Sequence, residues 1–245
     1  MYTDNNFIFN GVLLSRLFVA ETVLRPVGAH KRFTQTPIMQ GVAASTFGYE
    51  AGSIKVAGNL LGETPQEVLQ SRIELTRILT EPADEVRISF PDDLGMLMYS
   101  GFYVGGCEMT GNVINPELTL QFFIPRMIAY GARHSQAVYA RSDAPLNIGG
   151  TQPTYPIFTL TTHTSGITTI KKYHNDKPTH CLNVHTDTAG TIIIDCEQES
   201  VTHTGGGKAY VDLASDFFTL EAGDMVVPNI IDPDKLIVTW EDRYV

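Results

Sequence analysis

Apolar residues alternate with polar or small residues along most of this chain, which is the two-residue period of β-strands. Residues 7–20 and 37–58 show the alternation early in the sequence, and glycines interrupt it at short intervals. Short alternating runs separated by turn residues are typical of β-sandwiches and β-barrels. The pattern therefore predicts a mainly β protein.

One segment has the period of an α-helix instead. In residues 63–80, ETPQEVLQSRIELTRILT, Thr64 can cap a helix, Pro65 suits its first position and Glu67 completes a capping box. Pro82 ends the segment, because proline cannot continue a helix. The apolar residues that fall on one side of it are Val68, Leu69, Ile73, Leu75, Ile78 and Leu79. This is the one helix that the sequence predicts.

The strand pattern divides the chain into two parts. In the first part, MLMYSGFYVGG (96–106) and ELTLQFFIP (117–125) follow the helix, whereas beyond Arg141 a turn-rich stretch precedes a series of short strand candidates without a helix. We predict two domains, residues 1–141 with the helix and residues 142–245 as a β-sandwich.

The stretch GGTQPTYPIFTL (149–160) stands near the start of the second part. Its two glycines allow a turn, whereas Pro153 and Pro156 fix their own φ and favour extended backbone at the residues before them. A flexible tether would not carry two prolines followed by apolar residues. We therefore predict a structured entry strand here, with a hinge slightly earlier, around residues 142–150.

The composition indicates a globular protein, since 43% of the 245 residues are hydrophobic and 18% are charged. The formal net charge of −10 is uneven: residues 1–145 contain 11 basic and 14 acidic residues, and residues 146–245 contain 6 and 13. An acidic surface repels phosphate groups, so no nucleic-acid partner is expected. The change in charge near residue 145 agrees with two domains.

The three cysteines, Cys107, Cys181 and Cys196, are odd in number and irregularly spaced, which predicts free thiols made in a reducing cytosol. The apolar stretch near the start of the chain follows Asp4 and is interrupted by Arg16, so it is not expected to act as a signal peptide. No other apolar run approaches the length of about 18 residues that spans a membrane, and no membrane partner is expected.

Carboxylates and histidines give no strong catalytic or metal-binding pattern. Asp195, Glu197 and Glu199 alternate along one predicted strand, which favours a solvated sheet face over the two facing carboxylates of a glycosidase. Cys181 and a late group of histidines raise a zinc hypothesis. That group is His163, His174, His180, His185 and His203. His180 and His185 are an odd number of residues apart and would face opposite ways on one strand. No CxxC, HxxxH or HExxH motif occurs either, so no metal site is predicted.

Other candidates also favour structural roles. Residues 205–208, GGGK, superficially resemble a phosphate loop, but alanine follows in place of a magnesium-binding hydroxyl and no helix pattern comes after it. Ser215 lacks a GxSxG context. Trp240 alternates in phase with apolar neighbours and is expected in a core, whereas Tyr155 and Phe158 are ambiguous. The sequence predicts no catalytic residue, no cofactor and no enzyme.

The order of the elements resembles the distal tail proteins of siphophages, especially those that infect Gram-positive bacteria. The first half is similar from FIFNGVLL (7–14) through QEVLQSRIELTRIL (66–79) to ELTLQFFIPRMIAYG (117–131). In the second half, G-T-x-P-T-Y-P is the strongest single element. The stretches that match there are, in order, NIGGTQPTYPIFTL (147–160), TIIIDCE (191–197), SDFFTLEAGD (215–224) and RYV (243–245). No single motif is diagnostic, and the resemblance is specific because the stretches occur in this order.

The resemblance implies an N-terminal ring-forming, tail-tube-like domain, a β-sandwich or barrel with one helix, and a C-terminal galectin-like β-sandwich. It implies a structural virion protein, synthesised in the host cytoplasm, that forms a homo-hexameric ring at the tail tip. The ring would join the tail tube protein to the tail-associated lysin or adsorption protein, and residues 1–140 would make most ring contacts. Receptor-binding proteins and cell-wall saccharide are left open as partners, although no long insertion is present that would form a gripping arm.

Two other functions stay open at this point. One is a carbohydrate-binding host-recognition module that uses an exposed aromatic residue of the second domain. The other is a tail-tube subunit, which would form an extended polymer instead of a closed ring. A wall hydrolase would need a facing acid pair that the sequence does not offer.

Overall fold

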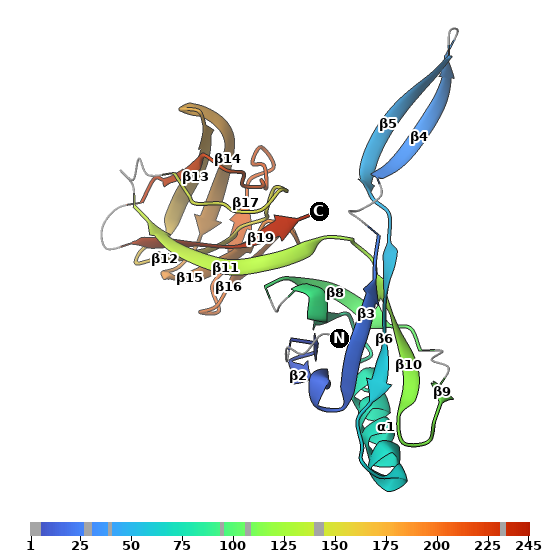
Figure 1. The fold of residues 1–245 in the computed structure, drawn as a ribbon. Helices are drawn as coiled ribbons and strands as arrows, with labels where there is room; N and C mark the ends of the chain where they lie inside the picture. Colours follow the sequence, from blue (N-terminus) through green and yellow to red (C-terminus); the bar gives the residue numbers. More distant parts are fainter. Residues whose placement is uncertain are drawn as a thin grey trace. The chain divides into compact units, whose positions relative to one another are not determined.

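The computed structural model describes residues 6–26, 31–38, 41–93, 96–105, 109–139, 145–230 and 234–245 (Figure 1). Strands dominate these ranges, which contain one α-helix, and the predicted mainly β fold is confirmed. No helix within them is long and apolar enough to cross a membrane.

The chain divides into two compact units. The first unit contains Met1–Tyr130 together with Val245, and the second contains Gly131–Tyr244. The predicted boundary after residue 141 lies later than this division, because strand β11 (Ala129–Val138) contributes all but its first two residues to the second unit. The turn-rich stretch that suggested the boundary is a connection inside the second unit.

The first unit is built from antiparallel strands, two short 3-10 helices and the α-helix. Their bounds are β1 (Ile8–Phe9), β2 (Val12–Leu13), η1 (Leu14–Arg16), β3 (Phe18–Leu24), β4 (Lys31–Ile38), β5 (Gly41–Tyr49), β6 (Gly52–Leu60), α1 (Pro65–Thr80), β7 (Val86–Ser89), η2 (Pro91–Asp93), β8 (Met98–Tyr103), β9 (Met109–Gly111) and β10 (Pro116–Ile124). Strands β8, β10, β6 and β3 are neighbours in that order, β9 also pairs with β10, and β7 joins β8 to β1. Strands β4 and β5 form a two-stranded sheet of their own.

The helix α1 begins where the sequence predicts. The Thr64 hydroxyl accepts a hydrogen bond from the Glu67 N–H at 3.3 Å, and the Glu67 carboxylate accepts one from the Glu63 N–H at 2.8 Å. The buried helical residues are Val68, Leu75, Ile78 and Leu79. The other two apolar residues of the predicted stripe are exposed, Leu69 by 50% and Ile73 by 60%, so the stripe is wider than the face that the sheet covers.

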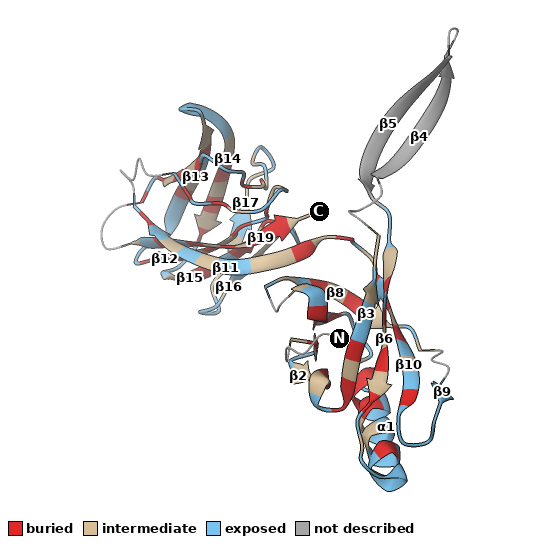
Figure 2. Ribbon diagram, viewed as in Figure 1, coloured by how far each residue is buried: buried red, intermediate tan, exposed pale blue. Residues whose placement is uncertain are grey.

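The core of the first unit is a cluster of phenylalanine side chains on one face of the sheet. Phe122 of β10 lies at its centre, with its ring centroid 5.9 Å from those of Phe7 and Phe9 and 5.5 Å from that of Phe90. Buried residues alternate with exposed or half-buried ones along β6 and β10 (Figure 2). This alternation leaves the second face of the sheet mostly polar and partly exposed, with Phe123 among its exposed side chains.

The second unit is a β-sandwich. Its strands after β11 are β12 (Ile157–Thr162), β13 (Gly166–His174), β14 (Lys177–Thr186), β15 (Gly190–Asp195), β16 (Ser200–His203), β17 (Ala209–Val211), β18 (Asp224–Pro228) and β19 (Lys235–Tyr244). One sheet has the order β16-β15-β12-β19-β11 and the other the order β17-β14-β13-β18. Both sheets contribute inward residues to one core, as the predicted sandwich requires.

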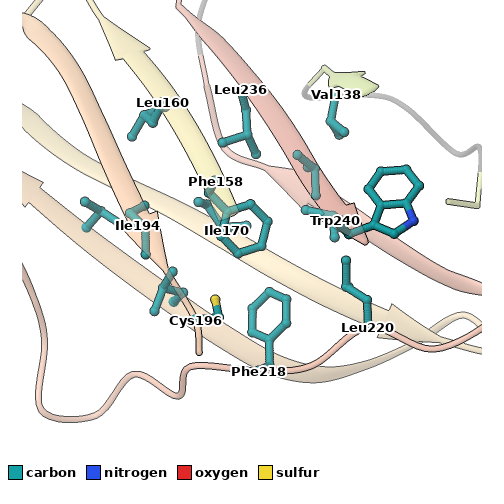
Figure 3. Packing of buried hydrophobic residues seen from close by; sticks show 14 of the residues in the cluster. Val138, Phe158, Leu160, Ile170, Ile194, Cys196, Phe218, Leu220, Leu236 and Trp240 are labelled. Carbon is teal, nitrogen blue, oxygen red and sulfur yellow. The ribbon is translucent and has the colours of Figure 1, made fainter. Parts of the chain in front are cut away.

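Alternate residues of facing strands fill this core (Figure 3). Phe158 of β12 is fully buried and its ring centroid lies 5.5 Å from that of Phe218. Trp240 of β19 is 4% exposed, so its predicted core position is confirmed, and Phe158 also belongs to the core.

The two ends of the second unit lie together. Strands β11 and β19 are neighbours in one sheet. A Cβ atom placed on Gly131 would lie 2.7 Å from Cε2 of Tyr244, so the first and last residues of the unit are in direct contact.

Candidate functional site

Residues 149–156, here called the entry segment, are bound to the last strand of the second unit. The Gly149 N–H donates to Oδ1 of Asp242 at 2.8 Å. The N–H groups of Thr151 and Gln152 both donate to the Arg243 carbonyl oxygen, at 2.8 and 3.1 Å. The entry segment is therefore structured, as predicted, and it is held by the other end of the unit. It is not itself a strand, however, because it makes only isolated bridges and β12 begins at Ile157.

Further along the entry segment, Thr154 joins two more parts of the unit. Its N–H donates to the Leu220 carbonyl oxygen at 2.9 Å, and its hydroxyl donates to the Glu241 carbonyl oxygen at 2.6 Å. Thr154 is 2% exposed, so these bonds are shielded from water. They replace the strand ladder that Pro153 and Pro156 cannot extend.

Gly150 makes the close approach to β19 possible. Its φ is +86°, in the left-handed region that favours glycine. A Cβ atom there would lie 2.2 Å from the Arg243 carbonyl oxygen and 2.8 Å from its nitrogen. The backbone of β19 therefore leaves no room for a side chain at residue 150.

The side chains that follow Trp240 extend these contacts. Oδ2 of Asp242 lies 3.0 Å from Nε2 of His134, and the His134 ring stacks on the Trp240 ring with centroids 5.4 Å apart. The guanidinium of Arg243 lies 4.9 Å from the Tyr155 ring centroid. Tyr155 is 39% exposed but has a cation over its ring, so it offers a poor platform for a ligand.

The hinge predicted around residues 142–150 is wrong for the part of it that the structure describes. Leu146 and Ile148 are buried in the sandwich core. The Leu146 N–H also donates to the Asp224 carbonyl oxygen at 2.9 Å. Apolar side chains packed in a core oppose hinge motion, and the sequence pattern underrated these two residues because turn formers surround them.

A buried carboxylate, Asp224, fixes the loop before β18. Its Oδ2 lies 2.8 Å from Nζ of Lys172 and accepts the Glu221 N–H at 2.7 Å, and its Oδ1 lies 2.7 Å from Nδ1 of His174. Asp224 is fully buried and Lys172 is 6% exposed, so each ion depends on the other. Sequence reasoning missed this group, although Lys172 is in phase with Ile170 on the buried side of β13.

The three carboxylates Asp195, Glu197 and Glu199 do not share one strand face, and that prediction is wrong. Strand β15 ends at Asp195, whose Oδ1 accepts the N–H groups of Glu197 and Gln198 at 2.9 and 3.0 Å. Glu199 has a φ of +49°, which belongs to a tight turn. A side chain that hydrogen-bonds its own following backbone starts a turn, and this competed with strand formation.

The late histidines occupy separate places. His163 pairs with Asp234, and His174 with Asp224. His180 lies against Phe218 with ring centroids 5.9 Å apart, whereas His185 stacks on Tyr210 at 4.7 Å. Over the residues that can be placed, no three His, Cys, Asp or Glu side chains form a group that could hold a metal ion.

The GGGK stretch is a turn between β16 and β17. The N–H groups of Gly205 and Gly207 both point to Nδ1 of His203, at 3.0 and 3.3 Å, and the Lys208 N–H donates to Oδ1 of Asp187 at 2.7 Å. These amides already have acceptors within the chain. A phosphate would have to displace them, so the geometry is that of a structural turn.

The remaining polar and thiol candidates serve the fold. The hydroxyl oxygen of Ser215 accepts the Asn183 N–H at 2.8 Å. Cys181 is half-buried and Cys196 is buried, and both are free thiols. Cys107 lies outside the described residues.

Burial raises the pKa of the Cys196 thiol to about 12. We expect this thiol to react with a disulfide reagent at pH 8 at least about tenfold more slowly than in denaturant, because the thiolate is the reactive form. Absorbance-monitored labelling of a Cys107→Ser, Cys181→Ser variant measures this, and a Cys107→Ser, Cys196→Ser variant, which keeps the less buried Cys181, is the comparison. Equal rates in native and denatured protein would contradict the buried position.

A charge cluster fixes the end of β3 in the first unit. The guanidinium of Arg25 lies 5.3 Å from the ring centroids of both Phe90 and Tyr99 and 3.1 Å from the Asp93 carboxylate, and it also contacts Asp92. Burial raises the pKa of the Asp93 carboxyl, and Arg25 opposes that rise. The cluster joins the end of β3 to η2.

The first unit also presents an open sheet face. On β10, Glu117, Thr119 and Phe123 are exposed, and on β6 Lys55 is exposed. At one edge of this sheet, β3 has a neighbour on one side only within the described strands. An uncovered face with an unpaired edge is a surface suited to assembly.

The comparisons agree with this two-unit architecture. Residues 149–244 match the family described as the C-terminal domain of siphovirus-type tail components, named after the Dit protein of phage SPP1. The matched residues make up most of the second unit. No curated protein sequence matches the chain.

Over nearly its whole length the chain has the fold of the phage SPP1 Dit protein, with a TM-score of 0.78 at 17% identity, covering 98% of this chain and 99% of that one. That structure is described as a paradigm of the hub adsorption apparatus of phages that infect Gram-positive bacteria. A chain of the phage p2 baseplate in its activated conformation with strontium gives a TM-score of 0.48 at 10% identity, covering 89% of this chain and 90% of that one.

Proposed function

We propose that this protein is a siphophage distal tail protein, a structural component of the virion at the tail tip. The observation that carries the proposal is the extent of the likeness: residues 149–244 match a tail component family, and the SPP1 Dit fold extends over 98% of the chain. The first unit is therefore included in the likeness. The contacts of the candidate residues are those of a scaffold: they hold strands, turns and loops together.

In this proposal the first unit forms the ring, with six copies as the resemblance to distal tail proteins implies. A cyclic ring needs two different surfaces on each copy that fit one another. The open sheet face and the unpaired edge of β3 support this role. The more acidic second unit suits a position at the periphery, where repulsion between copies is weaker.

The proposed partners are the tail tube protein on one side of the ring and the tail-associated lysin or adsorption protein on the other. Receptor-binding proteins and a cell-wall saccharide are further candidates for the second unit. Tyr210 of this unit is 59% exposed and stacks on His185 beside Asp212. An aromatic ring held in this way can stack on a sugar.

Electron microscopy and native mass spectrometry of the purified full chain test the proposal. We expect closed rings, with a mass that corresponds to six copies. An extended polymer would instead indicate a tail-tube subunit. Single particles at every protein concentration would contradict a ring-forming role.

A further inference from the structure

The buried pair of Lys172 and Asp224 places an amine against a carboxyl group. Nζ of Lys172 lies 2.8 Å from Oδ2 of Asp224. Asp224 is fully buried and Lys172 is 6% exposed, so both groups are shielded from water. Two groups fixed at contact distance react without the entropy cost of bringing them together. The second unit therefore holds the two halves of an amide bond in one shielded site.

The pairing of two strands sets this contact. His174 of β13 lies opposite Asp224 of β18, and Lys172 comes two residues before His174, on the same face of β13. Lys172 and His174 therefore both reach the carboxylate from one strand. Because the contact is fixed by an antiparallel ladder and not by a loop, its geometry is preorganised.

The neighbouring hydrogen bonds activate the carboxyl group. The Glu221 N–H donates to Oδ2 of Asp224 at 2.7 Å, and Nδ1 of His174 lies 2.7 Å from Oδ1. A carboxylate only accepts hydrogen bonds, so Nδ1 of His174 carries the proton in this contact. N–H donors at both oxygens stabilise negative charge that develops there when a nucleophile attacks the carboxyl carbon.

An amide at this place would cost less than the ion pair. Two buried ions have lost their hydration, which is expensive even when they are paired. In an amide, the remaining N–H of Lys172 can still donate to the Thr219 carbonyl oxygen, which Nζ contacts at 2.7 Å. The amide oxygen can still accept from His174. Condensation would thus replace two buried charges with a neutral group whose hydrogen bonds are already in place.

We propose that Lys172 and Asp224 condense after folding to an isopeptide bond that joins β13 to β18. The ion pair is the state before this step. A proton moves from Nζ to Oδ2, which leaves a neutral amine and a neutral carboxylic acid. The lone pair of Nζ then forms a bond to Cγ of Asp224, and the electron pair of the C=O bond moves onto Oδ1, beside the N–H of His174.

The intermediate then breaks down to the amide. Nζ passes a second proton to Oδ2, the C=O bond re-forms from Oδ1, and Oδ2 leaves as water with the electrons of its bond to Cγ. One ammonium and one carboxylate give one amide and one water molecule, so no other reactant is needed. The bond ties the edge strand β18 covalently to its neighbour in the sheet.

Intact mass spectrometry of the full chain in denaturant tests the proposal. We expect folded protein incubated at neutral pH to become lighter than its sequence by one water molecule, whereas a chain kept in urea retains its full mass. A tryptic digest should contain a branched peptide that joins Lys172 to Asp224. This peptide distinguishes the bond from a cyclic imide, which also forms with loss of water.

Lys172→Arg is the matched control, because it keeps a cation beside Asp224 and cannot form this amide. We expect it to retain its full mass. An unchanged mass of the wild type after prolonged incubation would overturn the proposal, as would loss of water from Lys172→Arg or from the unfolded chain. The proposal is independent of the ring, since protein that forms no rings can still lose water.

Two further variants test the role of His174, whose side chain is 41% exposed and therefore open to substitution. His174→Leu removes the N–H donor at Oδ1 and is expected to slow the loss of water at least about tenfold. His174→Gln keeps an N–H donor and should retain most of the rate. Equal rates in the wild type and His174→Leu would contradict a catalytic role for His174.

Discussion

Replacing Gly150 with alanine is expected to lower the free energy of unfolding of the second unit by at least about 3 kcal/mol. The added Cβ atom would meet backbone atoms of Arg243 at 2.2 and 2.8 Å, and backbone in a paired strand cannot move aside cheaply. Urea unfolding followed by tryptophan fluorescence measures the effect. Trp240 is the only tryptophan and lies in the core of the second unit, so its emission reports on that unit.

Gly223→Ala is the control for this prediction. Gly223 has a φ of +88°, close to the +86° of Gly150, but a Cβ atom there would meet nothing within 4 Å. Only the backbone preference remains, which costs about 1–2 kcal/mol. If the two variants lose equal stability, the contact between the entry segment and β19 is not what requires glycine.

Replacing Asp224 with alanine is expected to lower the stability of the second unit by about 3–5 kcal/mol, because the ammonium group of Lys172 would remain buried without its carboxylate. The side chain of Lys172 is 8% exposed, so water cannot replace the lost partner without a change in structure. His174 and the Glu221 N–H also lose their acceptor. Urea unfolding followed by Trp240 emission measures the loss.

A double-mutant cycle separates the ion pair from simple packing. Asp224→Leu combined with Lys172→Met removes both charges and keeps apolar volume, so we expect the double variant to be more stable than Asp224→Leu alone. If the effects of the two substitutions on the free energy of unfolding are simply additive, Asp224 and Lys172 do not stabilise the fold as a pair. Asp234→Asn, which weakens the contact with the half-exposed His163, should cost less than about 1 kcal/mol.

Local sequence signals predicted local structure well. The helix could be placed from Thr64, Pro65 and Glu67 because the capping contacts lie within a few residues. The structured character of the entry segment followed from its two prolines. Its partner could not be predicted, since Arg243 lies some 90 residues away in the chain and the contact uses backbone atoms that have no sequence signature.

The sequence-based predictions that differ from the structure also have physical reasons. The three carboxylates alternate like a strand, but Asp195 bonds to the backbone of the residues that follow it and so forms a turn. The helix appeared fully amphipathic, yet Leu69 and Ile73 remain exposed because the sheet is narrower than the apolar stripe. The domain boundary was placed late because one long strand, β11, spans the division and has no break in its own sequence.

The contact between Gly131 and Tyr244 bears on how this protein can evolve. A unit whose first and last residues touch can be removed, replaced or enlarged without stretching the chain that carries it. The second unit therefore has the form of an exchangeable cassette. Recombination that cuts near residues 131 and 244 could exchange it while leaving the first unit and its core of phenylalanines unchanged.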